Sequence, residues 1–300
     1  MNQFYKLLDL KLTSAFPLLD LVRLEYRDVP QIEICNVEVS PILRGAQRVT
    51  PGFQVSKGNC LVDVANTARY FIRNGDQINV EPAPEANMAA VSLHLTDTAL
   101  GVLLLQRGVL LLKGAAVTNG REAMVFAGGA ATGKSTLAFH FCRQGWELLG
   151  DRFCALEIRG NNVFVYPIQR RLMLWQDILD VYGEGHIRYE PVTPFMGKFF
   201  VEPGCSNQVE AFPLTKLIFL ENDNRGRPEC VGLKPMEALK WIVNTTYASQ
   251  FIEEMVDIEL FFNLRYVVAL NVPTWLLVRP NKGCHPRALA KLIGQASLTN

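Results

Sequence analysis

Eight residues near the middle of the chain, residues 128–135, read GGAATGKS and fit the pattern G-x-x-x-x-G-K-[S/T]. Glycine at positions 128 and 133 permits backbone angles that direct successive N–H groups toward one bound anion. A helix that starts at Lys134 adds its unpaired amides and its dipole. In such a loop the lysine reaches the terminal phosphates and the Ser135 hydroxyl binds Mg²⁺. The motif therefore predicts a site for a nucleoside triphosphate, taken here as ATP, with Mg²⁺.

The segments on either side of the motif fit this interpretation. Residues 123–127 are apolar and predict a short buried strand, and residues 134–144 predict a helix with one apolar face that ends at Gly145. A glycine turn that only connects the strand to the helix is the alternative. The residues predicted to bind the nucleotide are Gly128, Gly129, Ala130, Ala131, Thr132, Gly133, Lys134, Ser135 and Thr136.

Composition excludes several classes of protein. The 300 residues include 30 basic and 29 acidic side chains, so the formal charge is only +1 and we expect no nucleic-acid partner. With 49% apolar and 20% charged residues, the chain can bury a substantial core in one large domain or two smaller ones. The seven cysteines include no C-x-x-C pair, which predicts reduced, buried thiols and neither a disulfide framework nor a zinc site.

A mean hydropathy of +0.11 is high and raises the question of a membrane. The most apolar stretch, residues 99–117, is interrupted by Gln106, Arg107 and Lys113. A spanning helix needs about 20 nearly uninterrupted apolar residues. The first residues also lack a basic start and an apolar stretch of the signal-peptide kind. We therefore expect no membrane partner and a cytoplasmic protein.

Strand patterns dominate the first third of the chain. Residues 32–39, 59–64, 69–73 and 77–80 predict strands, and Asn74-Gly75-Asp76 predicts a hairpin turn. A linker rich in proline follows, so we expect a β-rich N-terminal region over residues 1–95 and a second domain over residues 96–300. In the second domain, predicted strands (146–158, 162–166, 214–220) alternate with predicted helices (235–244, 285–295). This alternation indicates an α/β or mixed α+β fold.

Two carboxylates follow short apolar runs of predicted strands and are candidates for holding the metal. Asp151 comes soon after the motif helix and Glu221 follows residues 214–220. A carboxylate that accepts a proton from an attacking hydroxyl must lie near the terminal phosphate, which favours Asp151. Glu221 fits a solvated strand end better. A guanine-reading N-K-x-D is absent, since residues 281–284 read NKGC, and so is the S-G-G-Q signature of transporter ATPases.

Residues 107–117, the glycine motif and residues 145–152 together resemble the catalytic domain of HPr kinase/phosphorylase. More specifically, the chain resembles the HPr-kinase-related proteins of bacterial gene clusters, which include kinases of lasso-peptide precursors. It continues through residues 166–175, 212–221 and 235–239, and upstream through residues 68–76. It spans most of residues 65–295, although only the glycine motif is specific by itself.

This resemblance implies an ATP- and Mg²⁺-dependent kinase that phosphorylates a serine-type hydroxyl of a protein or peptide. It also implies a P-loop core of the kind shared with ATP-type phosphoenolpyruvate carboxykinase, with a smaller β-rich N-terminal region that serves partner recognition or completes the fold. Lys134 then corresponds to the phosphate-binding lysine, Ser135 to the magnesium serine and Asp151 to one of two paired aspartates. Members of the parent family form multimers, which points to a homo-oligomer.

The sequence departs from the family at two catalytic positions. The family pairs two aspartates, whereas Gly150-Asp151-Arg152 contains one. The upstream histidine of the family is Lys113 here. A lysine supplies a fixed charge and does not pass protons in both directions as histidine does, so we expect weak or no phosphorolysis. The alternative for Lys113 is a side chain that only extends from its strand.

These departures keep a second function open, an ATP-binding regulatory or scaffold module with weakened catalysis. A carboxykinase fits less well, because no cluster of metal-binding histidine and lysine is visible beyond the motif. Among the remaining polar residues, we expect His140 to be partly buried and hydrogen-bonded, His94 to lie in an alternating strand and His186 to lie in a turn. Residues 183–204 predict a loop that closes over substrate or an ordinary long loop. We expect Arg170 and Arg171 either to contact phosphate or to cap a strand.

Overall fold

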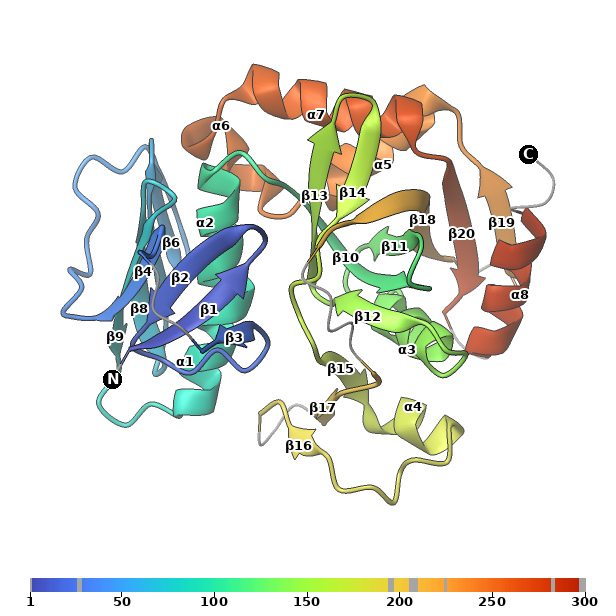
Figure 1. The fold of residues 1–300 in the computed structure, drawn as a ribbon, viewed down its shortest axis with the longest axis horizontal. Helices are drawn as coiled ribbons and strands as arrows, with labels where there is room; N and C mark the ends of the chain where they lie inside the picture. Colours follow the sequence, from blue (N-terminus) through green and yellow to red (C-terminus); the bar gives the residue numbers. More distant parts are fainter. Residues whose placement is uncertain are drawn as a thin grey trace. The chain divides into compact units, whose positions relative to one another are not determined.

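The computed structural model describes residues 2–25, 29–193, 197–204, 210–223, 226–281 and 284–296, in a mixed α+β fold with several mixed sheets (Figure 1). The chain divides into two compact units. The first contains Met1–Leu111 and Tyr247–Asn263, and the second contains Leu112–Thr246 and Leu264–Asn300. The boundary expected after residue 95 differs from this division, because a continuous helix crosses that position and a later segment returns to the first unit.

A nine-stranded sheet forms most of the first unit. Its order is β3-β1-β2-β4-β9-β8-β7-β6-β5, and the pairs β2–β4 and β4–β9 are parallel. The predicted hairpin is confirmed, because β8 and β9 pair across Asn74–Asp76 with Asn74 and Gly75 at positive φ. The strands are β1 (Gln3–Leu7), β2 (Leu10–Ser14), β3 (Val22–Leu24), β4 (Ile32–Asn36), β5 (Arg48–Thr50), β6 (Phe53–Ser56), β7 (Asn59–Val64), β8 (Ala68–Arg73) and β9 (Gln77–Pro82).

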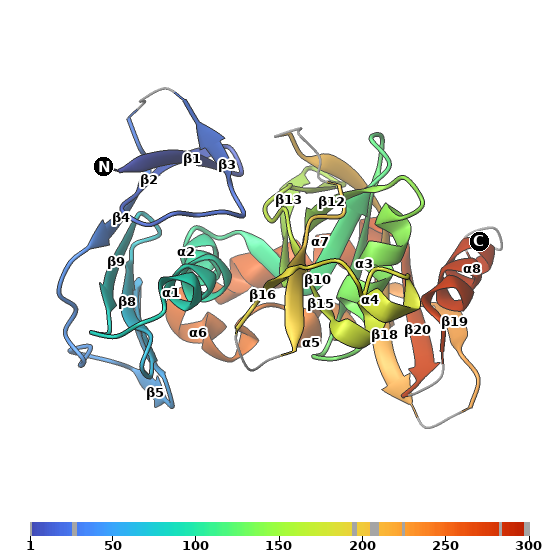
Figure 2. The same cartoon turned by 90° about the horizontal axis from the view of Figure 1, so that it is seen from below.

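One long helical segment packs on this sheet (Figure 2). It comprises α1 (Met88–His94), η1 (Leu95–Ala99) and α2 (Leu100–Gln106). His94 therefore lies in a helix, and its prediction as part of a strand is wrong. The helix Met88–Gln106 is long and apolar enough to cross a bilayer by length and composition, and 56% of its apolar window is buried inside the protein. A core helix passes the same test, and Leu103 and Leu104 are fully buried.

The second unit contains an eight-stranded sheet of order β11-β10-β13-β14-β18-β20-β19, with β12 paired to β10 and an additional pairing of β11 with β18. Its strands are β10 (Leu110–Thr118), β11 (Ala123–Gly128), β12 (Glu147–Gly150), β13 (Phe153–Arg159), β14 (Asn162–Val165), β18 (Phe212–Asp223), β19 (Glu229–Gly232) and β20 (Thr274–Pro280). Helices α5 (Pro235–Thr245) and α8 (Pro286–Ala296) also belong to this unit. The segment that returns to the first unit contains η2 (Ser249–Phe251) and α6 (Ile252–Met255), and α7 (Ile258–Asn271) begins in that segment and continues into the second unit.

Three neighbouring strands of this sheet, β11, β18 and β20, run parallel. Alternate side chains point to opposite faces of a strand. One set, which includes Phe126, Ile218 and Leu277, packs in a core with helices α3 (Lys134–Cys142) and α8. On the other face Phe219 stacks on Trp241 of α5 at 5.8 Å between ring centroids. The three strands are therefore covered on both faces, and their carboxyl ends meet at one edge.

Helix α3 differs from the amphipathic helix that the sequence predicts. All six residues from Leu137 to Cys142 are buried, so the helix lies inside the unit. The strand expected over residues 146–158 is interrupted at Asp151 and Arg152, where β12 ends and β13 has yet to begin. The six cysteines in the described ranges are free thiols. Three of them, Cys60, Cys142 and Cys154, are buried as predicted, whereas Cys35, Cys230 and Cys284 are partly exposed, and Cys205 lies outside these ranges.

A small three-stranded sheet, β15-β17-β16, projects from the second unit (Figure 1). It contains β15 (Leu172–Trp175), β16 (Glu190–Pro191) and β17 (Lys198–Val201), and α4 (Gln176–Val181) follows β15 directly. Most of the stretch predicted as a loop, residues 183–204, therefore belongs to this small sheet and its connections. Residues 194–196 of that stretch lie outside the described ranges.

Candidate active site

The glycine motif connects β11 to α3 at the carboxyl edge of the three parallel strands. Gly128 has φ +153°, and a Cβ placed on it would lie 2.6 Å from the Leu220 carbonyl oxygen, so this position needs glycine. Gly133 has φ +98°, and Ala131 also lies in the left-handed region at +58°. Helix α3 then begins at Lys134. This is the strand, loop and helix arrangement that the sequence predicts.

Side chains from the ends of the two neighbouring strands hold the loop. Arg279, near the end of β20, donates from Nε to the Thr132 carbonyl at 2.9 Å and from a terminal nitrogen to the Ala131 carbonyl at 3.4 Å. Asn222 of β18 donates to the same Ala131 carbonyl at 3.3 Å. These donors engage the carbonyl groups of the loop, which leaves its N–H groups available to an anion.

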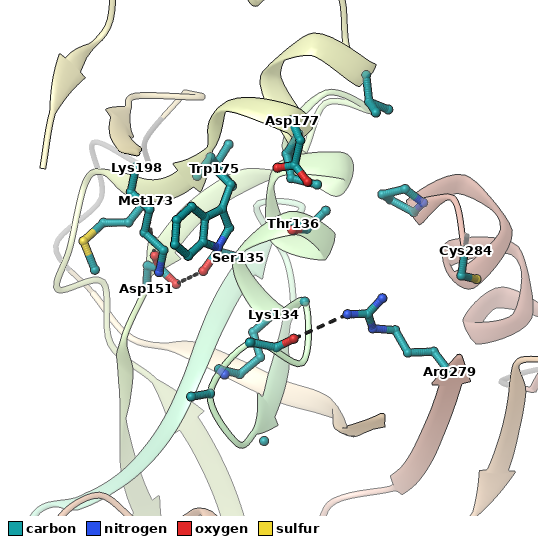
Figure 3. A pocket seen from close by; sticks show the side chains of 18 of the residues that line it. Lys134, Ser135, Thr136, Asp151, Met173, Trp175, Asp177, Lys198, Arg279 and Cys284 are labelled. Carbon is teal, nitrogen blue, oxygen red and sulfur yellow. Dashed lines mark hydrogen bonds between the residues drawn. The ribbon is translucent and has the colours of Figure 1, made fainter. Parts of the chain in front are cut away.

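Asp151 and Ser135 meet at the start of α3. The Ser135 hydroxyl donates to Oδ1 of Asp151 at 2.8 Å, as Figure 3 shows. Oδ2 of the same carboxylate accepts the Met173 N–H at 3.1 Å, and the Asp151 N–H donates to the Gln169 side chain at 3.2 Å. Asp151 is only 2% exposed, so its position is fixed by β12, β15 and α3 together.

This pair of oxygen ligands fits a magnesium ion. Mg²⁺ is usually held by one or two protein oxygens together with phosphate oxygens of the substrate. In P-loop enzymes these protein oxygens come from the motif Ser or Thr and from a strand-end Asp. Ser135 and Asp151 have this relation. The described residues contain no group of three or more His, Cys, Asp or Glu side chains that would bind a metal by themselves.

Basic side chains surround the buried carboxylate. Burial lowers the pKa of Lys134, nearby Asp151 acts against this shift, and the positive charges of Lys198 and Lys113 lower the pKa further. The ammonium groups of Lys198 and Lys113 are therefore each close enough to repel that of Lys134. Arg152 follows Asp151 with φ +77°, and its carbonyl accepts the N–H of Gly114 at 3.2 Å, beside Lys113. A non-glycine residue in this conformation indicates local strain at the site.

These residues line one pocket of about 820 Å³ in the second unit (Figure 3). It runs from the loop over the first turn of α3 to α4 and to the start of α8. Its lining residues are Lys113, Gly128, Ala130, Ala131, Gly133, Lys134, Ser135, Thr136, Asp151, Arg152, Met173, Leu174, Trp175, Asp177, Ile178, Val181, Lys198, Arg279, Asn281, Cys284, His285 and Pro286.

The predicted site residues Lys113, Lys134, Ser135, Thr136 and Asp151 thus face a common space. Gly129 and Thr132 are part of the loop but not of the pocket lining, and the Thr132 hydroxyl and the Lys134 amino group both donate to the Gly129 carbonyl. The remaining loop residues predicted to bind nucleotide, Gly128, Ala130, Ala131 and Gly133, line the pocket.

Other candidates lie elsewhere. Glu221 is exposed and is not part of the pocket wall, which agrees with a solvated strand end. Arg171 packs over the Phe200 ring at 3.9 Å and pairs with Glu190 at 3.1 Å, so it has a structural role in the small sheet. His140 is buried and hydrogen-bonded to Tyr182 at 2.7 Å, as expected.

Several residues that build the site were not predicted from the sequence. Arg279 and Asn222 reach the loop from positions about 90 to 150 residues further along the chain, a proximity that only the parallel pairing of β11, β18 and β20 creates. Trp175 and Asp177 come from the small sheet and from α4. The one available signal was the position of Arg279 and Asn222 at the ends of apolar runs.

Comparisons with known proteins give limited information. No family model matches the chain, and no curated protein matches it. Among solved structures, the HPr(Ser) kinase/phosphatase from Coxiella burnetii matches with 12% sequence identity and a TM-score of 0.35, covering 63% of this chain and 90% of the other. This match is a structural relationship and does not assign the chain to a family.

Proposed function

We propose that this protein is an ATP- and Mg²⁺-dependent kinase that transfers the γ-phosphoryl group to a serine-type hydroxyl of a protein or peptide. The observation that carries the proposal is the 2.8 Å contact of Ser135 with Asp151 beside a loop whose N–H groups can bind phosphate. When bound, Mg²⁺ would neutralise charge on the β- and γ-phosphates. Ser135 and Asp151 would hold this ion.

The other residues would act on the phosphates by position and charge. The loop amides and the first turn of α3 bind the β-phosphate, and Lys134 reaches the terminal phosphates. Phosphoryl transfer passes through a loose transition state in which charge spreads over the equatorial oxygens. Lys113 and Lys198 lie where they can stabilise that charge. Catalysis in this proposal depends mainly on electrostatic stabilisation and less on a strong base.

Asp151 is the candidate acceptor of the hydroxyl proton, and this role requires that one of its oxygens be free to bind that proton. Both of its oxygens already accept hydrogen bonds, one from Ser135 and one from Met173. To take a proton, the carboxylate has to give up one of these bonds. This observation also favours the second function, an ATP-binding regulatory or scaffold module with weak catalysis, because the chain lacks a second aspartate at this position.

Incubation with γ-labelled ATP, Mg²⁺ and a panel of serine peptides distinguishes the two functions. A kinase transfers label to at least one peptide, and omission of Mg²⁺ abolishes the transfer. A regulatory module binds ATP with Mg²⁺ but leaves every peptide unlabelled. Failure to bind ATP at all would contradict both functions.

The proposal extends to partners and location. We place the enzyme in the cytoplasm, with a protein or peptide as acceptor and neither nucleic acid nor a membrane as partner. A homo-oligomer is part of this proposal, and light scattering of the purified full chain tests it directly.

A further inference from the structure

Asp151 lies outside the regular part of the sheet that carries it. Strand β12 ends at Gly150 and β13 begins at Phe153, so the backbone of Asp151 lies beyond the hydrogen-bonded ladders of both strands. The next residue, Arg152, has a strained φ of +77°. The oxygen ligands of Mg²⁺ have to be held close to octahedral geometry. Contacts from outside the sheet therefore have to fix the backbone from which the Asp151 carboxylate extends.

Gln169 supplies such a contact. Gln169 is buried, and its side-chain Oε1 accepts the Asp151 N–H at 3.2 Å. The preceding Ile168 N–H donates to the Leu149 carbonyl at 2.7 Å, which ties the backbone beside Gln169 to the end of β12. Four residues after Gln169, the Met173 N–H donates to the Asp151 carboxylate at 3.1 Å. One short segment of the chain therefore holds Asp151 at its backbone and at its side chain.

The approach of Gln169 depends on a glycine at position 150. A Cβ placed on Gly150 would lie 2.8 Å from Oε1 of Gln169, which is closer than a carbon and an oxygen approach without a bond. Gly150 is not among the glycines with positive φ, so its backbone conformation is open to other residues. The glycine is therefore needed for the space that it leaves, and a larger residue would push the amide away from the Asp151 N–H.

The other end of the Gln169 amide lowers stability. Its Nε2 is buried and forms no hydrogen bond within the part of the chain that the structure describes. A buried donor without a partner is unfavourable, and an apolar side chain of similar size would avoid this penalty. Turning the amide over would place Nε2 against the Asp151 N–H, so that two donors would face each other. The bond to Asp151 therefore explains this arrangement, and the stability of the core does not.

We propose that Gln169 is a positioning residue of the metal site, which holds the Asp151 backbone so that the carboxylate and the Ser135 hydroxyl meet at one Mg²⁺ ion. Gly150 acts with Gln169 by leaving room for its amide. Gln169 does not line the pocket, so it acts through Asp151 and not on the nucleotide or the acceptor. This inference rests on the metal site of the proposed function and does not require phosphoryl transfer.

Calorimetry of a non-hydrolysable ATP analogue, with and without Mn²⁺, tests this role without using catalysis. Mn²⁺ prefers the same oxygen ligands and octahedral geometry as Mg²⁺, so it should increase the affinity of the full chain for the analogue. Gln169→Met removes the amide and keeps the size of the side chain. The Mn²⁺-dependent increase in affinity should then fall about tenfold, as is usual when the partner of a metal ligand is removed. Binding of the analogue without Mn²⁺ should stay the same, because the glycine loop is unaltered.

Two further variants separate positioning from a general loss of stability. Gly150→Ala should also reduce the Mn²⁺-dependent increase, because its Cβ displaces the Gln169 amide. Gln144→Met is the matched control, since it removes a glutamine hydrogen bond, to His140 at 3.0 Å, outside the pocket wall. This control should keep the full Mn²⁺-dependent increase.

Each outcome decides the inference. An increase in Gln169→Met equal to that of the unaltered chain overturns it, and if this variant does not fold, an undiminished increase in Gly150→Ala overturns it. Absence of any increase in the unaltered chain overturns the metal site and the inference together. A loss of the increase in Gln169→Met, in a protein that labels no peptide, supports the positioning role and contradicts the kinase function.

Discussion

At the scale of single residues, the Asp151 carboxylate has two proposed roles, to hold Mg²⁺ and to accept the hydroxyl proton. It receives the Ser135 hydroxyl and the Met173 N–H, and it is buried among basic side chains. Asp151→Asn preserves the size of the side chain but removes the negative charge and half of its acceptor capacity. We expect this variant to bind ATP and to lose phosphoryl transfer by about 10²-fold or more. Nucleotide titration and labelled-ATP transfer, measured side by side, check this expectation.

The matched control is Glu221→Gln, which removes a carboxylate from an exposed strand end outside the pocket wall. It should change neither binding nor transfer. Full transfer activity in Asp151→Asn would remove Asp151 from the mechanism. Equal losses of transfer activity in both variants would indicate a general effect of removing negative charge and not a local role of Asp151.

Lys113 carries the second prediction at this scale. Lys113 lines the same pocket as Lys134 and Asp151, so in the proposed mechanism it supplies a positive charge near the phosphates and no side-chain base that returns a proton during the reverse reaction. We expect dephosphorylation of a phosphoserine peptide by inorganic phosphate to be weak or absent. Incubation of the phosphorylated peptide with inorganic phosphate and Mg²⁺ measures it, and efficient release of pyrophosphate would contradict this role of Lys113.

At the scale of elements, the glycine loop depends on the strands beside it. Arg279 makes two hydrogen bonds to loop carbonyls from β20. Hydrogen bonds from a charged donor contribute about 1.5–3 kcal/mol each when buried and less when exposed. We therefore expect Arg279→Leu to raise the KM for ATP about tenfold with a smaller change in kcat. Steady-state kinetics over a range of ATP concentrations separate the two constants.

Two further variants define the role of Arg279 as a positioning residue. Arg279→Lys keeps the charge but lacks the paired donors, so it should rescue the KM only in part. Arg121→Leu, at an exposed turn of the same unit, should match the unaltered chain. An unchanged KM in Arg279→Leu, together with a lowered melting temperature, would assign Arg279 to stability alone.

Helix α3 introduces a dependence of stability on pH. His140 is buried, accepts from Gln144 at Nε2 and faces the Tyr182 hydroxyl through Nδ1, an arrangement that suits the neutral ring. Burial lowers its pKa, and the positive charges of His285 and Arg287 lower it further. The unfolded chain then binds this proton more readily than the folded protein. Stability is fully present above the ordinary histidine pKa of about 6.5 and decreases as the pH falls below it.

Urea unfolding at about pH 7.5 and about pH 5.5 tests this sign. The unfolding midpoint should be lower at the acidic pH, and His140→Gln should reduce the difference. Part of the difference should persist, because burial also lowers the pKa of His94. His186→Gln, at an exposed position, serves as the control and should leave the difference intact. A midpoint that rises on acidification would contradict the assigned neutral state.

Elements with a strong local signal could be predicted from the sequence. The hairpin around Gly75 and the strand, loop and helix around Lys134 depend on glycines and on residues close in sequence. Helix α7 was not predicted, because it carries apolar residues nearly all around and has no clear 3.6-residue stripe. Strand β20 was not predicted either. Helix α2 lies within the most apolar stretch of the sequence, residues 99–117, where composition alone does not distinguish a buried helix from a buried strand.

The residues of the site that could not be predicted from the sequence share one physical cause, which is that they come from distant parts of the chain. Lys134, Ser135 and Asp151 lie within 18 residues of one another, and a local motif suffices to find the first two. Arg279, Asn222 and Trp175 become neighbours of that motif only through sheet pairing and through the small three-stranded sheet. Pairing between distant strands is set by tertiary packing, which a single sequence does not display.

At the scale of the whole molecule, the chain passes through the first unit twice. Tyr247–Asn263 returns to it after most of the second unit is complete. Within the first unit, the Tyr247 N–H donates to the Leu111 carbonyl at 2.9 Å and its hydroxyl to the Asp97 carbonyl at 2.8 Å. Phe251 packs on Phe53 with ring centroids 5.1 Å apart. The N-terminal sheet and the returning segment therefore share one core.

A chain truncated at the boundary that the sequence suggested, residues 96–300, tests this shared core. It would keep the helix α2 and the returning segment but lose the nine-stranded sheet on which they pack, exposing buried side chains such as Leu103 and Phe251 to water. Each large buried apolar side chain contributes about 1.5–3 kcal/mol. We expect the truncated chain to aggregate or to melt at least about 10 °C below the full chain, because the loss involves several such side chains. Size-exclusion chromatography and thermal unfolding with and without Mg²⁺ and ATP measure this. A monomeric 96–300 chain that melts like the full protein would show that the second unit folds without the sheet, and that the returning segment depends on other contacts.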